Sequence, residues 1–146
     1  TFKGFPSIHA HDLEGIPKHR EKVSVVGHYS GYTDNHIERV IKAAQKAGCK
    51  VPYSLISGDV CLTIPQLPDS QKYSFVFIDL DLYDGYKASL EGLYHRVEAG
   101  GIILFDEYQY TDEWPGAKRA VDEFMLDKPE ALRFFKYDGS AYIVKE

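Results

Sequence analysis

Two apolar segments near the middle of the chain decide the fold: Tyr-Ser-Phe-Val-Phe-Ile-Asp-Leu-Asp-Leu-Tyr at residues 73–83 and Ala-Gly-Gly-Ile-Ile-Leu-Phe-Asp-Glu-Tyr at residues 99–108. Each run of Val, Ile, Leu and Phe lies between turn residues and is typical of a buried strand of a parallel sheet. Each strand ends in a pair of acids. These acids should therefore lie at the carboxyl edge of the sheet, where open α/β sheets bind their ligands.

Helix and strand patterns alternate along the rest of the chain. Asp138-Gly139 indicates a hairpin turn, Pro115 suits the first turn of a helix, and Gly100-Gly101 should end the preceding helix. After a loop over residues 3–22, the expected elements are strands or extended segments at 22–27, 51–57, 73–80, 102–106, 132–137 and 141–145, and helices at 34–47, 85–97 and 115–127. This order predicts one α/β domain over residues 1–146, with a parallel sheet covered on both faces and an antiparallel strand at or near its edge.

Composition excludes several classes of protein. The formal net charge is −5, and the 17 Lys and Arg residues form no cluster, which argues against nucleic-acid binding. No apolar run approaches the roughly 20 residues of a membrane span, and no signal peptide is recognisable. Cys49 and Cys61 have neither CxxC nor metal-ligand spacing. We therefore expect a cytoplasmic protein with reduced thiols that binds neither nucleic acid nor membranes.

The acids after the two central strands could form a metal site. The spacing between Asp79 and Asp106 leaves room for one crossover helix, so the two strands should be neighbours. Asp79, Asp106 and Glu107 would then lie within reach of one hard cation, for which Mg²⁺ is the natural choice. Such an ion could orient a substrate and lower the pKa of its hydroxyl. The alternative, about equally supported by spacing alone, is that these acids cap the helices that follow.

Other candidate site residues adjoin these acids or end another strand. Asp59 follows Gly58 and could accept hydrogen bonds from an adenine amino group, although a turn or helix cap is as good an explanation. Tyr83 and Tyr108 stand next to the acidic pairs and are candidate substrate contacts. The histidines show no metal-binding spacing, which favours loop positions.

Several of these motifs together resemble the macrocin O-methyltransferase family: Phe-Ile-Asp-Leu-Asp-Leu-Tyr at 77–83, the Gly-Gly turn at 100–101, Phe-Asp-Glu-Tyr at 105–108 and Gly-Ala-Lys-Arg-Ala-Val-Asp-Glu-Phe at 116–124. The resemblance implies a Rossmann-like class I methyltransferase sheet. It also implies methyl transfer from S-adenosylmethionine to a hydroxyl of a sugar or glycosylated natural product, with Mg²⁺ orienting and activating the acceptor. Asp79, Asp106 and Glu107 match the family's metal-binding positions, although the family more often has Asp where Glu107 stands.

The resemblance also places the cofactor. Gly58 and Asp59 match the region that contacts adenine, and Thr1 and Phe2 would lie beside the cofactor. Asp79 is the expected catalytic residue, a metal ligand that also helps to deprotonate the hydroxyl. No GxGxG-like glycine loop occurs in the 146 residues. The resemblance places that loop and the first strand before Thr1, so we expect the sequence to be the C-terminal part of a longer protein.

Two other functions stay open on the sequence. Asp79-Leu-Asp81 has the form of the nucleophile loop of haloacid-dehalogenase-like phosphatases, but Tyr83 stands where that loop needs Thr or Val. A non-catalytic binding module with a methyltransferase fold would explain the missing glycine loop, whereas the retained carboxylates argue for catalysis. The identity of the acceptor and the formation of a homo-oligomer are left open.

Overall fold

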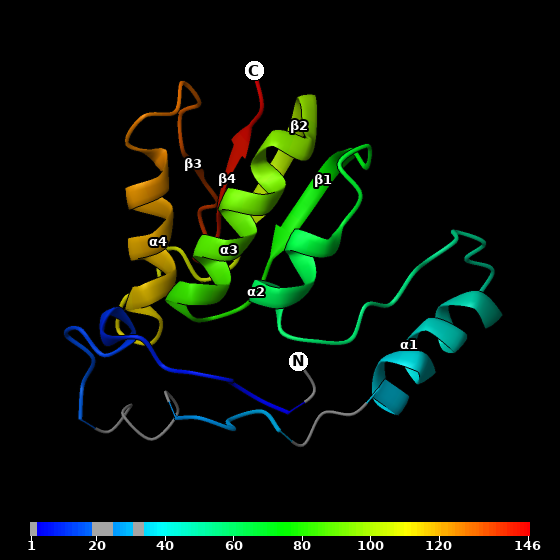
Figure 1. The fold of residues 1–146 in the computed structure, drawn as a ribbon, viewed down its shortest axis with the longest axis horizontal. Coiled ribbons are helices and arrows are strands. Elements are labelled where there is room, and N and C mark those ends of the chain that lie inside the picture. Colours follow the sequence, from blue (N-terminus) through cyan, green and yellow to red (C-terminus); the bar gives the residue numbers. More distant parts are fainter. Residues whose placement is uncertain (1–2, 19–24, 31–33) are drawn as a thin grey trace.

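The computed structural model describes residues 3–18, 25–30 and 34–146 and contains a four-stranded sheet in the order β1-β2-β4-β3 (Figure 1). β1 (Tyr73–Ile78) runs parallel to β2 (Val97–Phe105). β4 (Ala141–Val144) runs antiparallel both to β2 and to β3 (Arg133–Phe134). The predicted α/β sheet with a C-terminal antiparallel hairpin is therefore confirmed.

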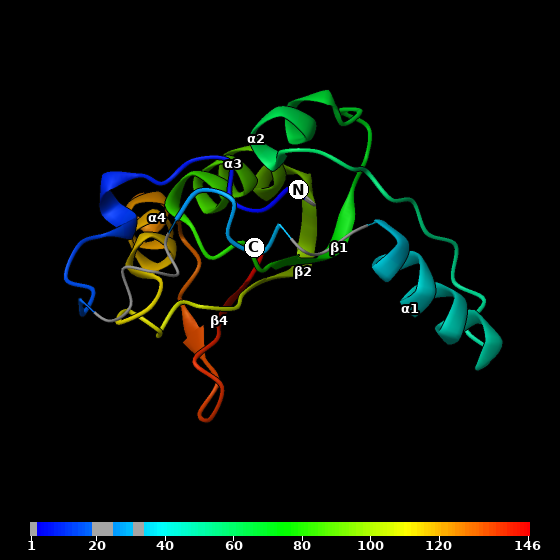
Figure 2. The ribbon, with the colours of Figure 1, turned by 90° about the horizontal axis from the view of Figure 1, so that it is seen from below.

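Two helices connect these strands and pack against each other. α3 (Tyr83–Leu93) follows β1, and α4 (Pro115–Met125) follows β2. Both helices lie on the same side of the sheet in the two perpendicular views (Figures 1 and 2). The shorter elements are α2 (Val60–Thr63) and the 3-10 turns η1 (Ala10–Asp12), η2 (Ile64–Gln66) and η3 (Tyr94–Arg96).

The core lies between these helices and one face of the sheet. Side chains alternate along β1, so that Val76 and Ile78 are buried whereas Phe75 and Phe77 are 54% and 49% exposed. The largest fully buried side chains include Tyr86, Leu90, Ile103, Phe105, Val121 and Ile143. The prediction of a sheet covered on both faces is wrong for the described residues, because both crossover helices pack on the same face.

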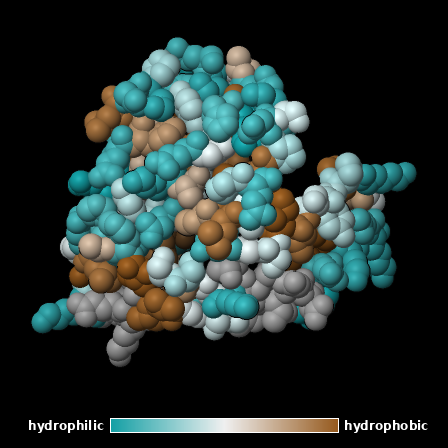
Figure 3. All heavy atoms as spheres, in the orientation of Figure 1, coloured by the Kyte–Doolittle hydropathy of each residue, from teal (hydrophilic) through white to brown (hydrophobic). Residues whose placement is uncertain are grey.

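One predicted strand does not form, and a second predicted segment is only partly described. Residues 51–57 are irregular and expose Tyr53 and Ile56, because they pair with no strand in the described part of the chain. Apolar side chains gather at the surface between the sheet and the outlying α1 (Figure 3). Of the predicted strand at 22–27, residues 25–27 form bends and turns, and residues 22–24 lie outside the described residues.

Two further expectations are corrected at the sheet. Gly100-Gly101 lies inside β2 instead of ending the helix before it, and Gly100 has a φ of +79°. The pairing of β1 with β2 shifts register between Tyr73 and Phe75, which is the signature of a β-bulge. The hairpin also contributes both its strands, since β4 lies inside the sheet beside β2 and β3 takes the edge.

The three predicted helices form. The first is α1 (Asp34–Lys46), which stands away from the sheet in both views and leaves Val40 59% exposed (Figures 1 and 2). The second begins earlier than predicted, at Tyr83, and is followed by η3. Among the helices that the structure describes, none is long and apolar enough to cross a membrane.

Candidate functional site

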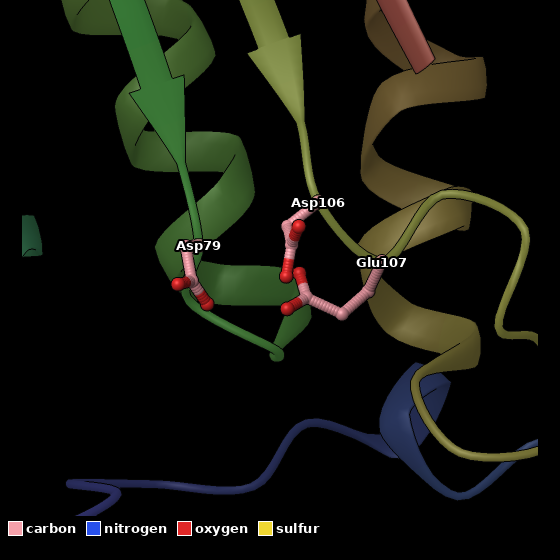
Figure 4. A group of neighbouring side chains, drawn as sticks. All are labelled: Asp79, Asp106 and Glu107. Carbon is pink, nitrogen blue, oxygen red and sulfur yellow. The ribbon is translucent and has the colours of Figure 1, made fainter. Parts of the chain in front are cut away.

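The parallel pairing of β1 and β2 brings three acids together at the carboxyl edge of the sheet. Ile78 is in register with Phe105, and the backbone N–H of Asp106 donates to Ile78 O at 3.1 Å. Asp79, Asp106 and Glu107 each direct a carboxylate oxygen toward the others, within 4.8 Å of one another (Figure 4). The structure therefore brings together the three residues that the sequence predicted as a cluster.

Glu107 is the most buried acid of this cluster, at 5% exposure. Its Oε2 lies 2.6 Å from the hydroxyl of Tyr86, a fully buried residue of α3, and that hydroxyl also lies 3.0 Å from Ile78 O. The pKa of Glu107 is raised to about 9, mainly by burial and also by nearby Asp106, Asp81 and Asp79, while the Tyr86 hydrogen bond acts in the opposite direction.

Asp79 is exposed at the mouth of the cluster, and Asp106 is half-buried behind it. Although the residue is exposed, partial desolvation of its carboxyl group by the surrounding protein raises the pKa of Asp79, and the neighbouring charge of Asp106 acts in the same direction. Ser140 Oγ donates to Asp106 Oδ1 at 3.4 Å. Among the ion pairs between described residues, none involves an acid of this cluster.

This donor set fits a hard divalent cation. The three residues offer only carboxylate oxygens, which are the ligands that Mg²⁺ and Ca²⁺ prefer. Carboxylates held this close together repel one another. This repulsion, together with burial, raises the pKa of Glu107. A divalent cation would offset this repulsion, so the fit rests on both the chemistry and the electrostatics of the cluster.

Asp81 joins this edge although the sequence analysis did not include it among the ligands. Its backbone has a φ of +62°, a conformation that non-glycine residues adopt rarely and at an energetic cost. Its pKa is raised to about 6, mainly by burial, with the charges of Asp79 and Asp106 acting in the same direction and a hydrogen bond with Glu107 acting against them. The Asp-x-Asp spacing pointed to this residue, but the left-handed turn that places it beside the cluster is visible only in the structure.

A cavity of about 220 Å³ opens beside these acids. Asp79 and Asp81 line one part of it, and Asp59 with Cys61 at the start of α2 lines another. The rest of its wall comes from residues 4–7 of the N-terminal segment, from Tyr29 and from the first turn of α3. The cavity therefore joins the carboxyl edge of the sheet to segments that are distant in sequence.

A known protein family matches more than half of the chain. Residues 49–139 match the family model of macrocin-O-methyltransferase (TylF). The chain belongs to this family. The matched stretch contains the cluster, Asp81 and Asp59, whereas residues 4–7 precede it. Comparison with curated protein sequences finds no match.

Solved structures share the fold of this macrocin O-methyltransferase family chain. The O-methyltransferase NovP superposes with a TM-score of 0.72 at 22% identity, and the calicheamicin methyltransferase CalS11 with 0.74 at 24%. A methyltransferase from Podospora anserina, PaMTH1, solved with bound SAH, gives 0.54 at 21% over 79% of this chain and 58% of its own. The NovP and CalS11 alignments cover 99% of this chain but 57% of each of those chains.

The candidate cofactor residues of this family member are only partly described. Asp59 caps α2, since its Oδ1 accepts a hydrogen bond from the Cys61 backbone N–H at 3.0 Å, and it also lines the cavity. Gly58 has a φ of +155°, and a Cβ there would overlap Thr63. The cap that the sequence left as an alternative for Asp59 is thus formed, while its contact with adenine stays a prediction. Thr1 and Phe2 lie outside the described residues.

The two candidate substrate tyrosines have partners within the fold. The Tyr83 hydroxyl donates to Glu123 Oε2 at 2.7 Å, and the Tyr108 hydroxyl donates to Asp122 Oδ1 at 2.6 Å. Both tyrosines are buried, and neither is among the residues that line the cavity. The structure therefore does not bring their hydroxyls to the cavity wall, and their contact with a substrate stays a prediction.

Proposed function

We propose that this chain is part of an enzyme that transfers the methyl group of S-adenosylmethionine to a hydroxyl of a small molecule. The acceptor would be a sugar or a glycoside, and Mg²⁺ would assist the transfer. The observation that carries this proposal is the convergence of Asp79, Asp106 and Glu107 beside a cavity at the carboxyl edge of a methyltransferase-family sheet. The names of NovP and CalS11, an O-methyltransferase and a methyltransferase, support the choice of reaction.

The residues suit the two groups that this reaction requires. Asp79, Asp106 and Glu107 would hold Mg²⁺ through their carboxylate oxygens. A cavity lined by carboxylates also suits S-adenosylmethionine, which carries a positive sulfonium group and an amino-bearing adenine. When bound, Mg²⁺ supplies an electrophile that lowers the pKa of a hydroxyl and fixes its orientation.

The chain's own acids would supply orientation and proton removal. The methyl group leaves the sulfonium sulfur and forms a bond to the acceptor oxygen, while the hydroxyl proton passes to a carboxylate. Asp79 is our candidate for that carboxylate, because it lies at the exposed mouth of the cluster and lines the cavity. Asp81 is the second candidate, since its left-handed turn places it at the same cavity wall. Loss of the true base should reduce kcat by about 10²- to 10⁴-fold.

The test combines cofactor binding, metal binding and methyl transfer. Wild-type protein should bind S-adenosylmethionine in calorimetry, and Mg²⁺ should raise its melting temperature because it binds only the folded cluster. Asp106→Asn should lose the effect of Mg²⁺ and the transfer of labelled methyl groups to a panel of sugar nucleotides and glycosides, while cofactor binding persists. Asp127→Asn, an exposed acid beyond the end of α4, is the matched control and should behave as wild type.

Two results would redirect the proposal. If wild-type protein bound neither S-adenosylmethionine nor Mg²⁺, the methyltransferase proposal would fail and a non-catalytic module would be favoured. Release of inorganic phosphate from sugar phosphates, lost in Asp79→Asn and without methyl transfer, would instead support the phosphatase alternative.

A further inference from the structure

A segment far from the acids in sequence completes the cavity. Residues 4–16, which we call the strap, cross the carboxyl edge of the sheet below the acidic cluster (Figures 1 and 4). Residues 4–7 of the strap line the same cavity as Asp59, Asp79 and Asp81. The position of one wall of the proposed site therefore depends on the position of the strap.

The first part of the strap has backbone and ring contacts of its own. Phe5 N–H donates to His28 O at 3.0 Å, and Gly27 N–H donates back to Phe5 O at 2.9 Å. The Phe5 ring packs edge-on against Trp114, with ring centroids 5.9 Å apart. Farther along, the ring of His9 stacks on Tyr83 at 4.6 Å. The ring contacts attach the strap to the starts of α3 and α4, and the backbone hydrogen bonds attach it to residues 27–28, all without using the acidic cluster.

Asp12 makes the most specific of the strap's attachments. Its side chain is 2% exposed, and both carboxylate oxygens are used: Oδ2 accepts from the His9 N–H at 2.8 Å, and Oδ1 accepts from the Tyr83 N–H at 2.7 Å. α3 has no cap from its own N-cap residue, Leu82. A carboxylate 71 positions earlier in the chain therefore satisfies a free amide of the first turn of α3.

The position of Asp12 is also enforced by the helix that faces it. Gly116 in the first turn of α4 lies so close that a Cβ there would overlap Asp12 Oδ1. The loop that carries Asp79 and Asp81 leads directly into α3, so Asp12 binds the strap to the element that follows these acids. One buried side chain thus links the strap to the start of α3, and both of these segments line the cavity.

We propose that Asp12 is a positioning residue, which holds residues 4–7 of the strap as a wall of the cavity by binding the start of α3 and so sets the affinity of the site for S-adenosylmethionine. The inference rests on the proposed function, since it names that cofactor as the molecule the wall encloses. Asp12 itself is not among the residues that line the cavity, so its effect is transmitted through the strap.

Two substitutions test this role by different routes. Asp12→Asn keeps one acceptor oxygen but turns an amide NH₂ toward one of the two backbone donors, so one hydrogen bond is lost. Gly116→Ala leaves Asp12 unchanged but displaces its carboxylate, while alanine favours the α4 helix itself. Glu14→Gln is the matched control, because Glu14 lies on the same strap, is exposed and contacts His11 instead.

The readouts separate a positioning role from a general loss of stability. Hydrogen exchange of the Phe5 and His9 amides should speed up by about tenfold or more in both variants. The Kd for S-adenosylmethionine should rise by about tenfold, which is the effect expected from the loss of one hydrogen bond. The kcat at saturating cofactor should change by less than about twofold, because no reacting group is altered. Glu14→Gln should match wild type in all three measurements.

The outcomes decide between the inference and the function on which it rests. Unchanged exchange of the Phe5 amide would overturn the role of Asp12, whatever the cofactor affinity. Faster exchange with an unchanged Kd would show that the strap does not shape the site and would also overturn it. If wild-type protein bound no S-adenosylmethionine, the proposed function would fail, and the exchange rates alone would still decide whether Asp12 holds the wall.

Discussion

The hydroxyl of Tyr86 is the point at which the acidic cluster depends most directly on the core. Tyr86 is fully buried, and its hydroxyl lies 2.6 Å from Glu107 Oε2 and accepts from the Glu107 N–H at 3.3 Å. Tyr86→Phe removes this hydroxyl and leaves both groups of Glu107 without that partner. Ile78 O also loses a donor, but it keeps the hydrogen bond from the Asp106 N–H.

The structure sets the expected size of the effect. Each buried polar group left without its partner costs about 1–3 kcal/mol, so the two groups of Glu107 together should lower the free energy of unfolding by about 3 kcal/mol. The same hydroxyl orients a proposed metal ligand, and loss of such outer partners typically reduces metal affinity by about 10- to 100-fold. Urea unfolding at pH 7.5, with EDTA and then with Mg²⁺, measures both effects.

Tyr137→Phe is the matched control, because Tyr137 is 88% exposed and should change the unfolding free energy by less than about 0.5 kcal/mol. A loss below about 1 kcal/mol for Tyr86→Phe would refute the reasoning, since it would mean that Glu107 does not depend on this hydrogen bond. An unchanged response to Mg²⁺ would separately refute the link between Tyr86 and the metal site.

Three further outcomes follow from other contacts. Burial alone would raise the pKa of Glu130, but the hydrogen bonds from Lys145 and Tyr94 outweigh it and lower this pKa to about 2. The ionised carboxylate should therefore stabilise the fold above pH 4.5 and lose that effect as the pH falls toward 2. Glu130→Gln should therefore cost about 3 kcal/mol at pH 7 and almost nothing near pH 2 in urea unfolding; a cost independent of pH would contradict this assignment. Asp59→Ala should lower the unfolding free energy by about 1 kcal/mol through loss of the α2 cap, and a larger loss of S-adenosylmethionine affinity in calorimetry would reveal a separate contact with the cofactor. Asp79→Asn should remove the Mg²⁺-dependent rise in melting temperature, and a rise equal to that of wild type would argue against its place in the metal site.

Much of this architecture could be predicted because it depends on local patterns. The apolar run before Asp79 and the helical spacing before Gly48 each specify an element within a short window, and Asp138-Gly139 specifies a hairpin. The neighbouring placement of Asp79 and Asp106 followed from a simple rule, that a strand, a crossover helix and a second strand form adjacent parallel strands.

The failures have a physical cause as well. Residues 51–57 have the composition of a strand, but a strand also needs a partner, and the described part of the chain offers none. The two glycines at 100–101 were expected to stop a helix, whereas the structure places both inside β2, where the pairing with β1 shifts register. Composition gives the tendency of a segment, while pairing in three dimensions decides what it becomes.

The sequence by itself determined the two central strands, the helices that follow them and the acids that end these strands, because all of these depend on residues that are close along the chain. Only the tertiary structure decided the burial, the backbone conformation and the contacts around those acids. Glu107 is buried against Tyr86, Asp81 adopts a left-handed turn beside the cluster, and Asp12 bonds to the start of α3. The last of these contacts joins residues 71 positions apart. No local spacing encodes such contacts, since they arise from the packing of the strap and helices over the end of the sheet.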